Sequence, residues 1–301
     1  MLPDVENLLL DRDGDTLTIW FNRPEVRNAL SQAVADDLAA VLEALPGEQA
    51  IRFVILRGKG GVFCAGGDLK MFKTVFQGGA DREEIVRFNA DFGRLMKGVQ
   101  ALPQLFIVLI EGAAMAGGLG LSCLADVVIT TADAKYSLTE VTLGIPPAQI
   151  TPVVMKRIGA SEARRLLLTA ARFDGTEAGR LGFAHFVVAD AQELEQQCQV
   201  ILDQASKGAP GAIAGTKEII NAVSKLDGDD RCSLPPSDSP TACSARKRKR
   251  GWRPSQRSAS RTGPRSVNRP AEVVGAAIGQ ETPNNGISYE TLRQYPGSQP
   301  R

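Results

Sequence analysis

The chain has 301 residues, of which 43% are hydrophobic and 23% charged, and a formal net charge of +1 at pH 7. This length allows one large domain or two, with a sizeable buried core. The balanced charge gives no electrostatic reason to expect binding to nucleic acid or to a membrane surface, and no stretch reaches the roughly 18 consecutive apolar residues of a membrane span.

Apolar periodicity predicts strands that alternate with helices through the first part of the chain. Two apolar runs around Asp13-Gly14 are typical of a β-hairpin, and Ser31 is a candidate N-cap for the helix that follows. The predicted elements up to residue 110 are hairpin strands 5–10 and 16–21, a helix 31–45, a strand 51–56, a helix from Asp68, a mobile loop 77–80, a helix 85–102 and a strand 105–110.

The second part of the chain continues with short strands and ends in helices. Its predicted elements are a turn and helix within 112–123, a strand 126–130, an extended piece 134–138, helices 151–158, 161–169 and 176–181, a strand 183–188, and helices 191–206 and 211–224. This order predicts an α/β layered domain followed by a helical region. We divide the chain into a core of residues 1–190, the start of a C-terminal helical region at 191–226, and an aberrant tail at 227–301.

Two turns of small residues carry the chemistry. Residues 57–67 (RGKGGVFCAGG) and 112–123 (GAAMAGGLGLSC) each follow an apolar strand and precede a helix. A turn with almost no side chains lets a ligand lie against the backbone, and a helix that begins near Gly117 points unpaired N–H groups at that ligand. This suits an oxyanion or a phosphate, although a tight helix–strand contact without a ligand stays open. The turn at 57–67 lacks the spacing of nucleotide-binding loops.

Several motifs together resemble the crotonase family of enoyl-CoA hydratases and isomerases. They are Asn22-Arg23-Pro24 with Asn28-Ala29-Leu30, FCAGGDL at 63–69, GAAMAGGLGLSCLAD at 112–126, YSLTE at 136–140, LGIPP at 143–147 and GRLGFAHFVV at 179–188. Their order and spacing agree with the family from residue 5 to residue 226. The resemblance implies an α/β fold, the crotonase-like spiral of ββα units with a C-terminal helical region, which assembles into homotrimers or hexamers.

The resemblance also implies a substrate and a mechanism. The substrate is an acyl thioester of coenzyme A, so coenzyme A belongs to the substrate and no cofactor or metal is expected. The enolate formed during reaction needs two backbone N–H donors, which the family match places on Ala65 and Gly117, and a carboxylate that moves protons, Glu140. Glu140 could instead be a solvated loop acid. The residues that the resemblance places at the substrate or its coenzyme A are Arg27, Ala29, Gly66, Gly67, Asp68, Leu69 and Gly118.

The second glutamate of many family hydratases maps to Gly120 and is therefore missing. A site with one glutamate fits hydratases of branched glutaconyl-CoA esters, isomerases, and some lyases or hydrolases. Residues 138–154 and 168–175 resemble most the hydratases of leucine and acyclic-terpene breakdown, which act on 3-methylglutaconyl-CoA and isohexenylglutaconyl-CoA. The expected enzyme is a carbon–oxygen lyase that hydrates such a 2-enoyl-CoA. A Δ3,Δ2-enoyl-CoA isomerase and a catalytically silent binder of CoA esters stay open as alternatives.

The cysteines and the single histidine give no catalytic set. The five cysteines are scattered, odd in number and without metal-ligand spacing, so reduced thiols in the cytoplasm are expected, with Cys64 and Cys123 as core residues. His185 stands beside an apolar strand, where a structural role is expected, and no Ser-His-Asp set can be assembled around it. The acidic N-terminus does not predict a signal peptide.

The composition changes after Asp227. Ser, Pro and Arg dominate, apolar periodicity ends, and residues 245–250 (ARKRKR) form a basic run. As written, residues 231–270 are expected to be disordered, and the basic run could be a nucleic-acid or nuclear-localisation patch. We favour a frameshift near residues 227–230, because one alternative frame of the back-translated segment gives an amphipathic, helix-favouring ending like that of the family. The altered tail is expected to impair assembly and activity.

Overall fold

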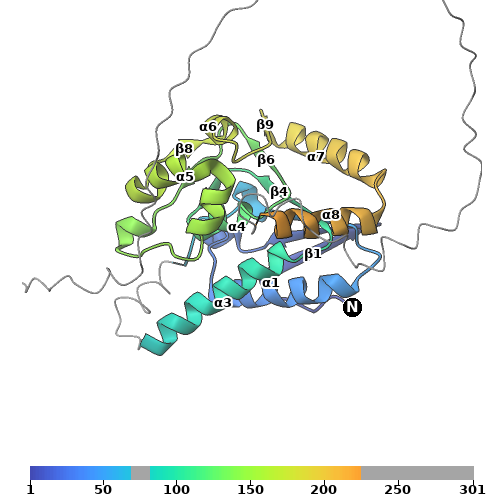
Figure 1. Ribbon diagram of the computed structural model, residues 1–301, viewed down its shortest axis with the longest axis horizontal. Helices are drawn as coiled ribbons and strands as arrows, with labels where there is room; N and C mark the ends of the chain where they lie inside the picture. The colour runs from blue at the N-terminus through green and yellow to red at the C-terminus, as the bar shows by residue number, and fades with distance from the viewer. Residues whose placement is uncertain (69–81, 225–301) are drawn as a thin grey trace, which may run out of the picture. The chain divides into compact units, whose positions relative to one another are not determined.

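The computed structural model describes residues 1–68 and 82–224, which form two β-sheets surrounded by helices (Figure 1). All of these residues fall within one compact unit, Met1–Lys249, and the second unit, Arg250–Arg301, lies wholly outside them. The predicted loop at 77–80, the helix from Asp68, the site residue Leu69 and the tail at 227–301 also fall outside the described residues.

The larger sheet has six strands. In spatial order they are β1 (Leu8–Asp13), β2 (Thr16–Phe21), β3 (Phe53–Gly58), β4 (Leu105–Ile110), β6 (Val127–Thr131) and β9 (Phe186–Val188). β1 runs antiparallel to β2, and the other neighbours pair in parallel. The predicted hairpin is confirmed, with its first strand starting at Leu8. Every residue of β3 is buried, as expected for a central parallel strand covered on both faces.

The smaller sheet places the two small-residue turns side by side. Its strands are β5 (Ala113–Met115), β7 (Lys135–Ser137) and β8 (Phe173–Asp174). The chain passes from β4 in the large sheet to β5 in the small one, through α4 (Gly117–Ser122), and back to β6 and then β7. An isolated parallel bridge from Cys64 to Ala114 joins the first turn to this layer, and a second one, from Leu30 to Gly67, joins the first turn to the segment before α1.

The helices mostly begin and end where the sequence predicts. They are α1 (Gln32–Ala44), α3 (Arg82–Gln100), α5 (Thr151–Thr169), α6 (Gly175–Arg180), α7 (Ala191–Ser206) and α8 (Pro210–Val223), with short 3-10 turns η1 (Pro24–Val26), η2 (Leu45–Gly47), η3 (Lys59–Gly61) and η5 (Glu140–Leu143). Ser31 caps α1, since its hydroxyl accepts the Val34 N–H at 3.3 Å. Gly159, with φ 77° and ψ 159°, breaks α5 into the two helices that were predicted. In residues 1–68 and 82–224, no helix combines the length and the apolar character that crossing a membrane requires.

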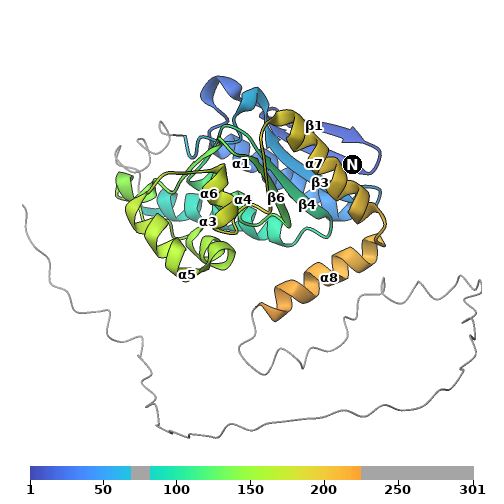
Figure 2. The same ribbon diagram turned by 90° about the horizontal axis from the view of Figure 1, so that it is seen from above.

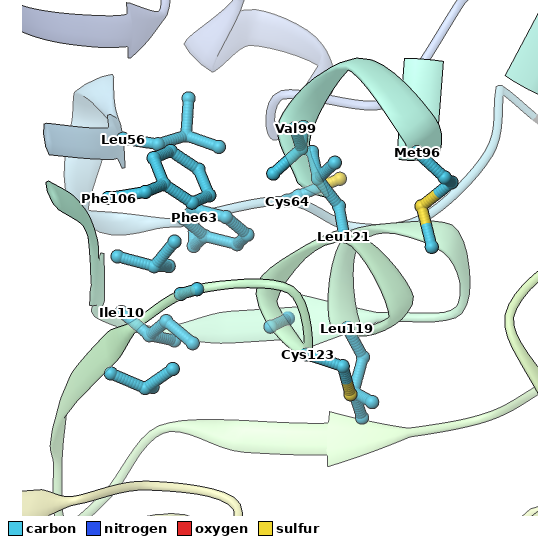
Figure 3. Close-up of a cluster of buried hydrophobic side chains, with 14 of the residues drawn as sticks. Leu56, Phe63, Cys64, Met96, Val99, Phe106, Ile110, Leu119, Leu121 and Cys123 are labelled. Carbon is cyan, nitrogen blue, oxygen red and sulfur yellow. The ribbon is translucent and has the colours of Figure 1, made fainter. Parts of the chain in front are cut away.

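Hydrophobic side chains cover both faces of the large sheet. Figure 2 shows α7 lying across the sheet, where Leu194, Cys198 and Ile201 pack on side chains of β3, β4 and β6. The main core fills the other face, between the sheet, α1, α3 and α4. In Figure 3, Leu119 and Leu121 of α4 lie within this core, so the second turn is anchored on a rigid base.

Candidate active site

A pocket lies where the two small-residue turns meet η5 and the segment that leads into α5. Its walls are Leu30 and Gly67 of the first turn region, Ala116 and Gly117 of the second, Asn89 and Phe92 of α3, Glu140 of η5, and every residue from Ile145 to Ile150. Its cavity volume is about 90 Å³, within about 640 Å³ of empty space that includes the part open to solvent. Its lining is mainly apolar, with three polar side chains.

The second turn contains a strained residue that starts α4. Ala116 has φ 49° and ψ −122°, a conformation that non-glycine residues rarely adopt. Its N–H donates to the Ser137 carbonyl at 2.9 Å, which fixes the bend. The next residue, Gly117, is the first residue of the helix. Its N–H therefore has no carbonyl four residues earlier in the helix to accept a hydrogen bond. Among the described residues this N–H makes no hydrogen bond, and Gly117 lines the pocket.

The structure contradicts the assignment of the other N–H donor to Ala65. The Ala65 N–H donates to the Arg27 carbonyl at 3.0 Å, and Ala65 does not line the pocket. Gly67, two residues later, does line it. The carbonyl before Gly67 and the N–H after it both pair with Leu30, at 2.8 and 3.0 Å, while the Gly67 N–H itself makes no hydrogen bond in the described part of the chain. The available donor of the first turn is therefore on Gly67.

Two glycines that are predicted to bind substrate also bring the turns together. Gly66 has φ +98°, and a Cβ added there would lie 3.3 Å from the Ala116 Cβ. A Cβ on Gly118 would lie 2.7 Å from both the Cβ and the Sγ of Cys64, which no real side chain tolerates. Neither glycine lines the pocket. The lack of side chains at these glycines therefore lets the two turns pack against each other, in addition to leaving the backbone open to a ligand.

The other predicted substrate contacts stay predictions. Arg27 is exposed, Ala29 and Asp68 are half-buried, and none of the three lines the pocket. Leu69 lies outside the described residues.

Asn28 fixes the loop that carries Arg27. It is 1% exposed, and its Nδ2 donates to the carbonyls of Lys59 and Val62 at 2.9 and 2.6 Å. Its Oδ1 accepts the Arg23 N–H at 2.9 Å. The asparagine of the NAL motif thus has a structural reason to be there, because it joins the loop to the turn that leads to Gly67.

Glu140 is buried with part of its carboxylate unpaired. It begins η5, its exposed fraction is 9%, and its Oε2 has no hydrogen-bond partner among the described residues. Burial raises the pKa of this carboxyl above its ordinary value of 4.5, and a backbone hydrogen bond offsets part of the effect. The structure brings Glu140 together with Gly117 and Gly67 at one pocket, where a carboxyl with a raised pKa can accept and return a proton.

Ile150 occupies the space next to Gly120, the position of the missing second glutamate. A Cβ on Gly120 would lie 2.7 Å from the Ile150 Cβ. Ile150 is 3% exposed and also lines the pocket. An apolar side chain therefore stands where the second carboxylate would enter, and Glu140 is the one acidic side chain in the pocket lining of the described chain.

Part of the pocket wall was not predicted as a site. Phe92 lies on the apolar face predicted for its helix, and the structure shows that this face borders the pocket as well as the core. Asn89 lies one turn earlier on α3 and gave no signal. The proline-containing segment 145–150 was noted for its resemblance alone, and no sequence pattern showed that it faces Glu140.

The histidine and the buried cysteines are structural, as predicted. The Nδ1 of His185 accepts the Val128 N–H at 2.9 Å, and burial followed by the nearby Arg157 lowers the pKa of its imidazole. Burial raises the pKa of the Cys64 and Cys123 thiols to about 12, so neither is an effective nucleophile. In the described ranges, no three His, Cys, Asp or Glu side chains gather closely enough to hold a metal ion.

Comparison with known proteins gives one consistent family. Residues 12–233 match the family described as enoyl-CoA hydratase/isomerase. A putative enoyl-CoA hydratase from Thermus thermophilus is 31% identical over 217 residues, which cover 72% of this chain and 85% of that protein. Carnitinyl-CoA dehydratase from Proteus mirabilis is 33% identical over 229 residues, covering 73% and 82%.

Solved structures agree with this family. Pseudomonas aeruginosa AtuE is 43% identical with a TM-score of 0.72, and the match covers 81% of this chain and 98% of that one. An enoyl-CoA hydratase/isomerase from Marinobacter aquaeolei is 37% identical with a TM-score of 0.71, covering 75% and 87%. The predicted α/β crotonase-like fold is thereby confirmed.

Proposed function

The chain belongs to the enoyl-CoA hydratase/isomerase family, and we propose that its own reaction is the addition of water to a branched 2-enoyl-CoA. The observation that carries the proposal is the meeting, in one pocket, of a buried carboxylate on Glu140 with uncommitted N–H groups on Gly67 and Gly117. These are the parts that addition next to a thioester carbonyl requires.

The two N–H groups form the proposed oxyanion hole. In a 2-enoyl thioester, attack at the β-carbon moves electrons to the thioester oxygen, which becomes an enolate oxygen. Donors on Gly67 and Gly117 would stabilise this charge, and each such donor is typically worth 10²–10³-fold in rate. Both donors are backbone groups, which explains why small side chains surround them.

Glu140 would carry out both proton transfers. Its carboxylate takes a proton from water while the water oxygen bonds to the β-carbon. The protonated carboxyl then gives that proton to the α-carbon as the enolate collapses, so one water has been added and Glu140 returns to its first state. The unpaired, buried Oε2 suits this exchange, because a pKa raised by burial lowers the cost of holding the proton.

The branched substrate is supported by resemblance and by the shape of the pocket. Residues 138–154 and 168–175 resemble hydratases of 3-methylglutaconyl-CoA and isohexenylglutaconyl-CoA. The lining includes the apolar side chains of Leu30, Phe92, Ile145 and Ile150, which suit an apolar branch.

A Δ3,Δ2-enoyl-CoA isomerase is the second candidate. The contact between Gly120 and Ile150 leaves one carboxylate in the pocket lining, and shifting a double bond requires one group that removes a proton and returns it two carbons away. The same oxyanion hole would stabilise the dienolate formed in this reaction.

The test is turnover by the full chain of the two branched 2-enoyl thioesters and of a 3-enoyl thioester. Hydration of a 2-enoyl-CoA supports the proposal. Conversion of the 3-enoyl substrate without hydration of either 2-enoyl substrate would replace it by the isomerase. Binding of all three without turnover of any would instead identify a silent binder of CoA esters.

A further inference from the structure

The turn that leads into α5 presents two neighbouring side chains to two glycines. Ile150 points at Gly120 of α4, as described above. The preceding residue, Gln149, points at α3, where its Oε1 would lie 3.1 Å from a Cβ placed on Gly93. Both Gln149 and Ile150 line the pocket. Glycine at position 93 therefore leaves room for the Gln149 amide to lie against the helix.

The Gln149 amide is a hydrogen-bonding group without a protein partner. In residues 1–68 and 82–224 its side chain makes no hydrogen bond or ion pair, and it is half-buried at the pocket wall. An amide has two N–H donors and one acceptor oxygen. Its amide atoms are not among the buried unpartnered atoms of the described chain, so solvent reaches them, and a ligand that supplies an acceptor can take the place of that water.

The surroundings decide which ligand group fits. Among residues 1–68 and 82–224 the pocket lining contains no lysine, arginine or histidine, so Gln149 offers its N–H donors without a competing cation from this part of the chain. The same lining includes the apolar side chains of Phe92 and Ile145. An acyl chain that is apolar except for one acceptor oxygen matches this pattern.

We propose that Gln149 is a specificity residue whose amide donates a hydrogen bond to an oxygen on the acyl group, either a carboxylate or a carbonyl, at the end away from the thioester. The inference rests on the proposed function only in requiring that the pocket receives the acyl part of a CoA thioester. It supplies a partner for the second carboxylate of a glutaconyl-type substrate, which the sequence did not identify.

The test measures binding, so it does not depend on turnover. Three saturated thioesters of equal chain length are compared by calorimetry with the full chain: glutaryl-CoA with a terminal carboxylate, 4-oxopentanoyl-CoA with a carbonyl, and pentanoyl-CoA with neither. Hydrogen bonds to charged groups are the stronger ones. We expect glutaryl-CoA to bind roughly 10–100-fold more tightly than pentanoyl-CoA, and the carbonyl compound about 2–10-fold more tightly.

The variant Gln149→Met keeps the length of the side chain and removes the amide. It should abolish both preferences while changing the affinity for pentanoyl-CoA less than about 3-fold. Gly93→Ala should reduce the preferences in part, because its Cβ displaces Oε1. The matched control is Gln199→Met, at an exposed position of α7. It should leave the affinities for all three thioesters unchanged.

Each outcome is decisive. Equal binding of the three thioesters by the wild type, or an equal loss for all three in Gln149→Met, overturns the inference and leaves the hydratase proposal standing. A preference that Gln149→Met abolishes supports the inference even where none of the enoyl thioesters in the turnover test is hydrated. In that case the hydratase proposal fails alone. Failure of all three to bind overturns both.

Discussion

Replacing Glu140 by glutamine should lower activity and raise stability at the same time. The change keeps the shape of a side chain that is 9% exposed and removes its charge. Loss of the proton carrier is expected to reduce kcat by about 10²–10⁴-fold, which corresponds to ~3–5 kcal/mol in the activation barrier. The wild-type fold buries an Oε2 that has no partner in the described chain, so removing the charge also removes an energetic penalty.

The gain in stability depends on pH in a defined direction. Burial raises the pKa of Glu140 above 4.5, so the folded state holds its proton to a higher pH than the unfolded state. Between 4.5 and the raised pKa the unfolded state binds fewer protons, and wild-type stability falls as pH rises through that window. Glu140→Gln should therefore gain little below pH 4.5 and progressively more as pH rises through the raised pKa. A buried unpaired group costs about 1–3 kcal/mol, which corresponds to a rise in Tm of roughly 2–10 °C.

Both effects are measured on the same preparation. Hydration is followed by loss of the enoyl-thioester absorbance, and thermal unfolding by circular dichroism at pH 4 and pH 7. The matched control is Glu177→Gln, which removes a half-buried carboxylate that is paired with Arg180 outside the pocket and should leave kcat unchanged. A kcat within tenfold of wild type would remove Glu140 from proton transfer. A lower Tm at pH 7 would show that its carboxylate is stabilised by a partner.

Four further predictions concern packing, thiols and the tail. Gly120→Ala should lower the free energy of unfolding, measured by urea denaturation, by about 1–3 kcal/mol, because the added Cβ meets Ile150. Adding Ile150→Ala to this variant should relieve part of that cost. Strictly additive effects of the two changes would show that the two positions do not touch. Cys64 and Cys123, with pKa values near 12, should resist iodoacetamide at pH 8 until the protein unfolds, and labelling of the folded chain, mapped by mass spectrometry, would contradict their burial. Sequencing of the gene across codons 227–230, compared with related genes, should show a one- or two-base insertion or deletion. An intact reading frame there would rule out the proposed frameshift. The chain as given should not form a stable trimer or hexamer in size-exclusion chromatography, and recovery of either would refute an assembly defect.

Elements with local signals were predictable from the sequence. Ser31 as a cap and Asp13-Gly14 as a turn act within a few residues, so their patterns were sufficient. β5 (Ala113–Met115) was not separable from the turn around it, because three small residues carry no apolar periodicity. It becomes a strand only through pairing with β7, which lies twenty residues further along the chain.

The candidate site was predictable in kind but not in every atom. The sequence indicated two turns with bare backbone and one carboxylate, and the structure brings Gly117 and Glu140 to one pocket. It could not show which N–H of the first turn remains available. That depends on the Arg27 carbonyl, which reaches across from another loop and takes the Ala65 N–H, leaving Gly67 as the donor. The hydrogen bond between Ala65 and Arg27 joins residues nearly forty positions apart, so the seven-residue motif at 63–69 could not predict it.

The contact between Gly120 and Ile150 joins two properties that sequence comparison treats separately. A glutamate at position 120 would collide with Ile150, because even its Cβ would fall 2.7 Å from the Ile150 Cβ. Ile150 cannot move freely, since it is 3% exposed and precedes α5 as its capping residue. A second carboxylate therefore requires the turn before α5 to be rebuilt, and that turn also carries Gln149 at the pocket wall. Because one turn carries both side chains, the number of carboxylates at the reacting carbons and the chemistry of the acyl wall change together.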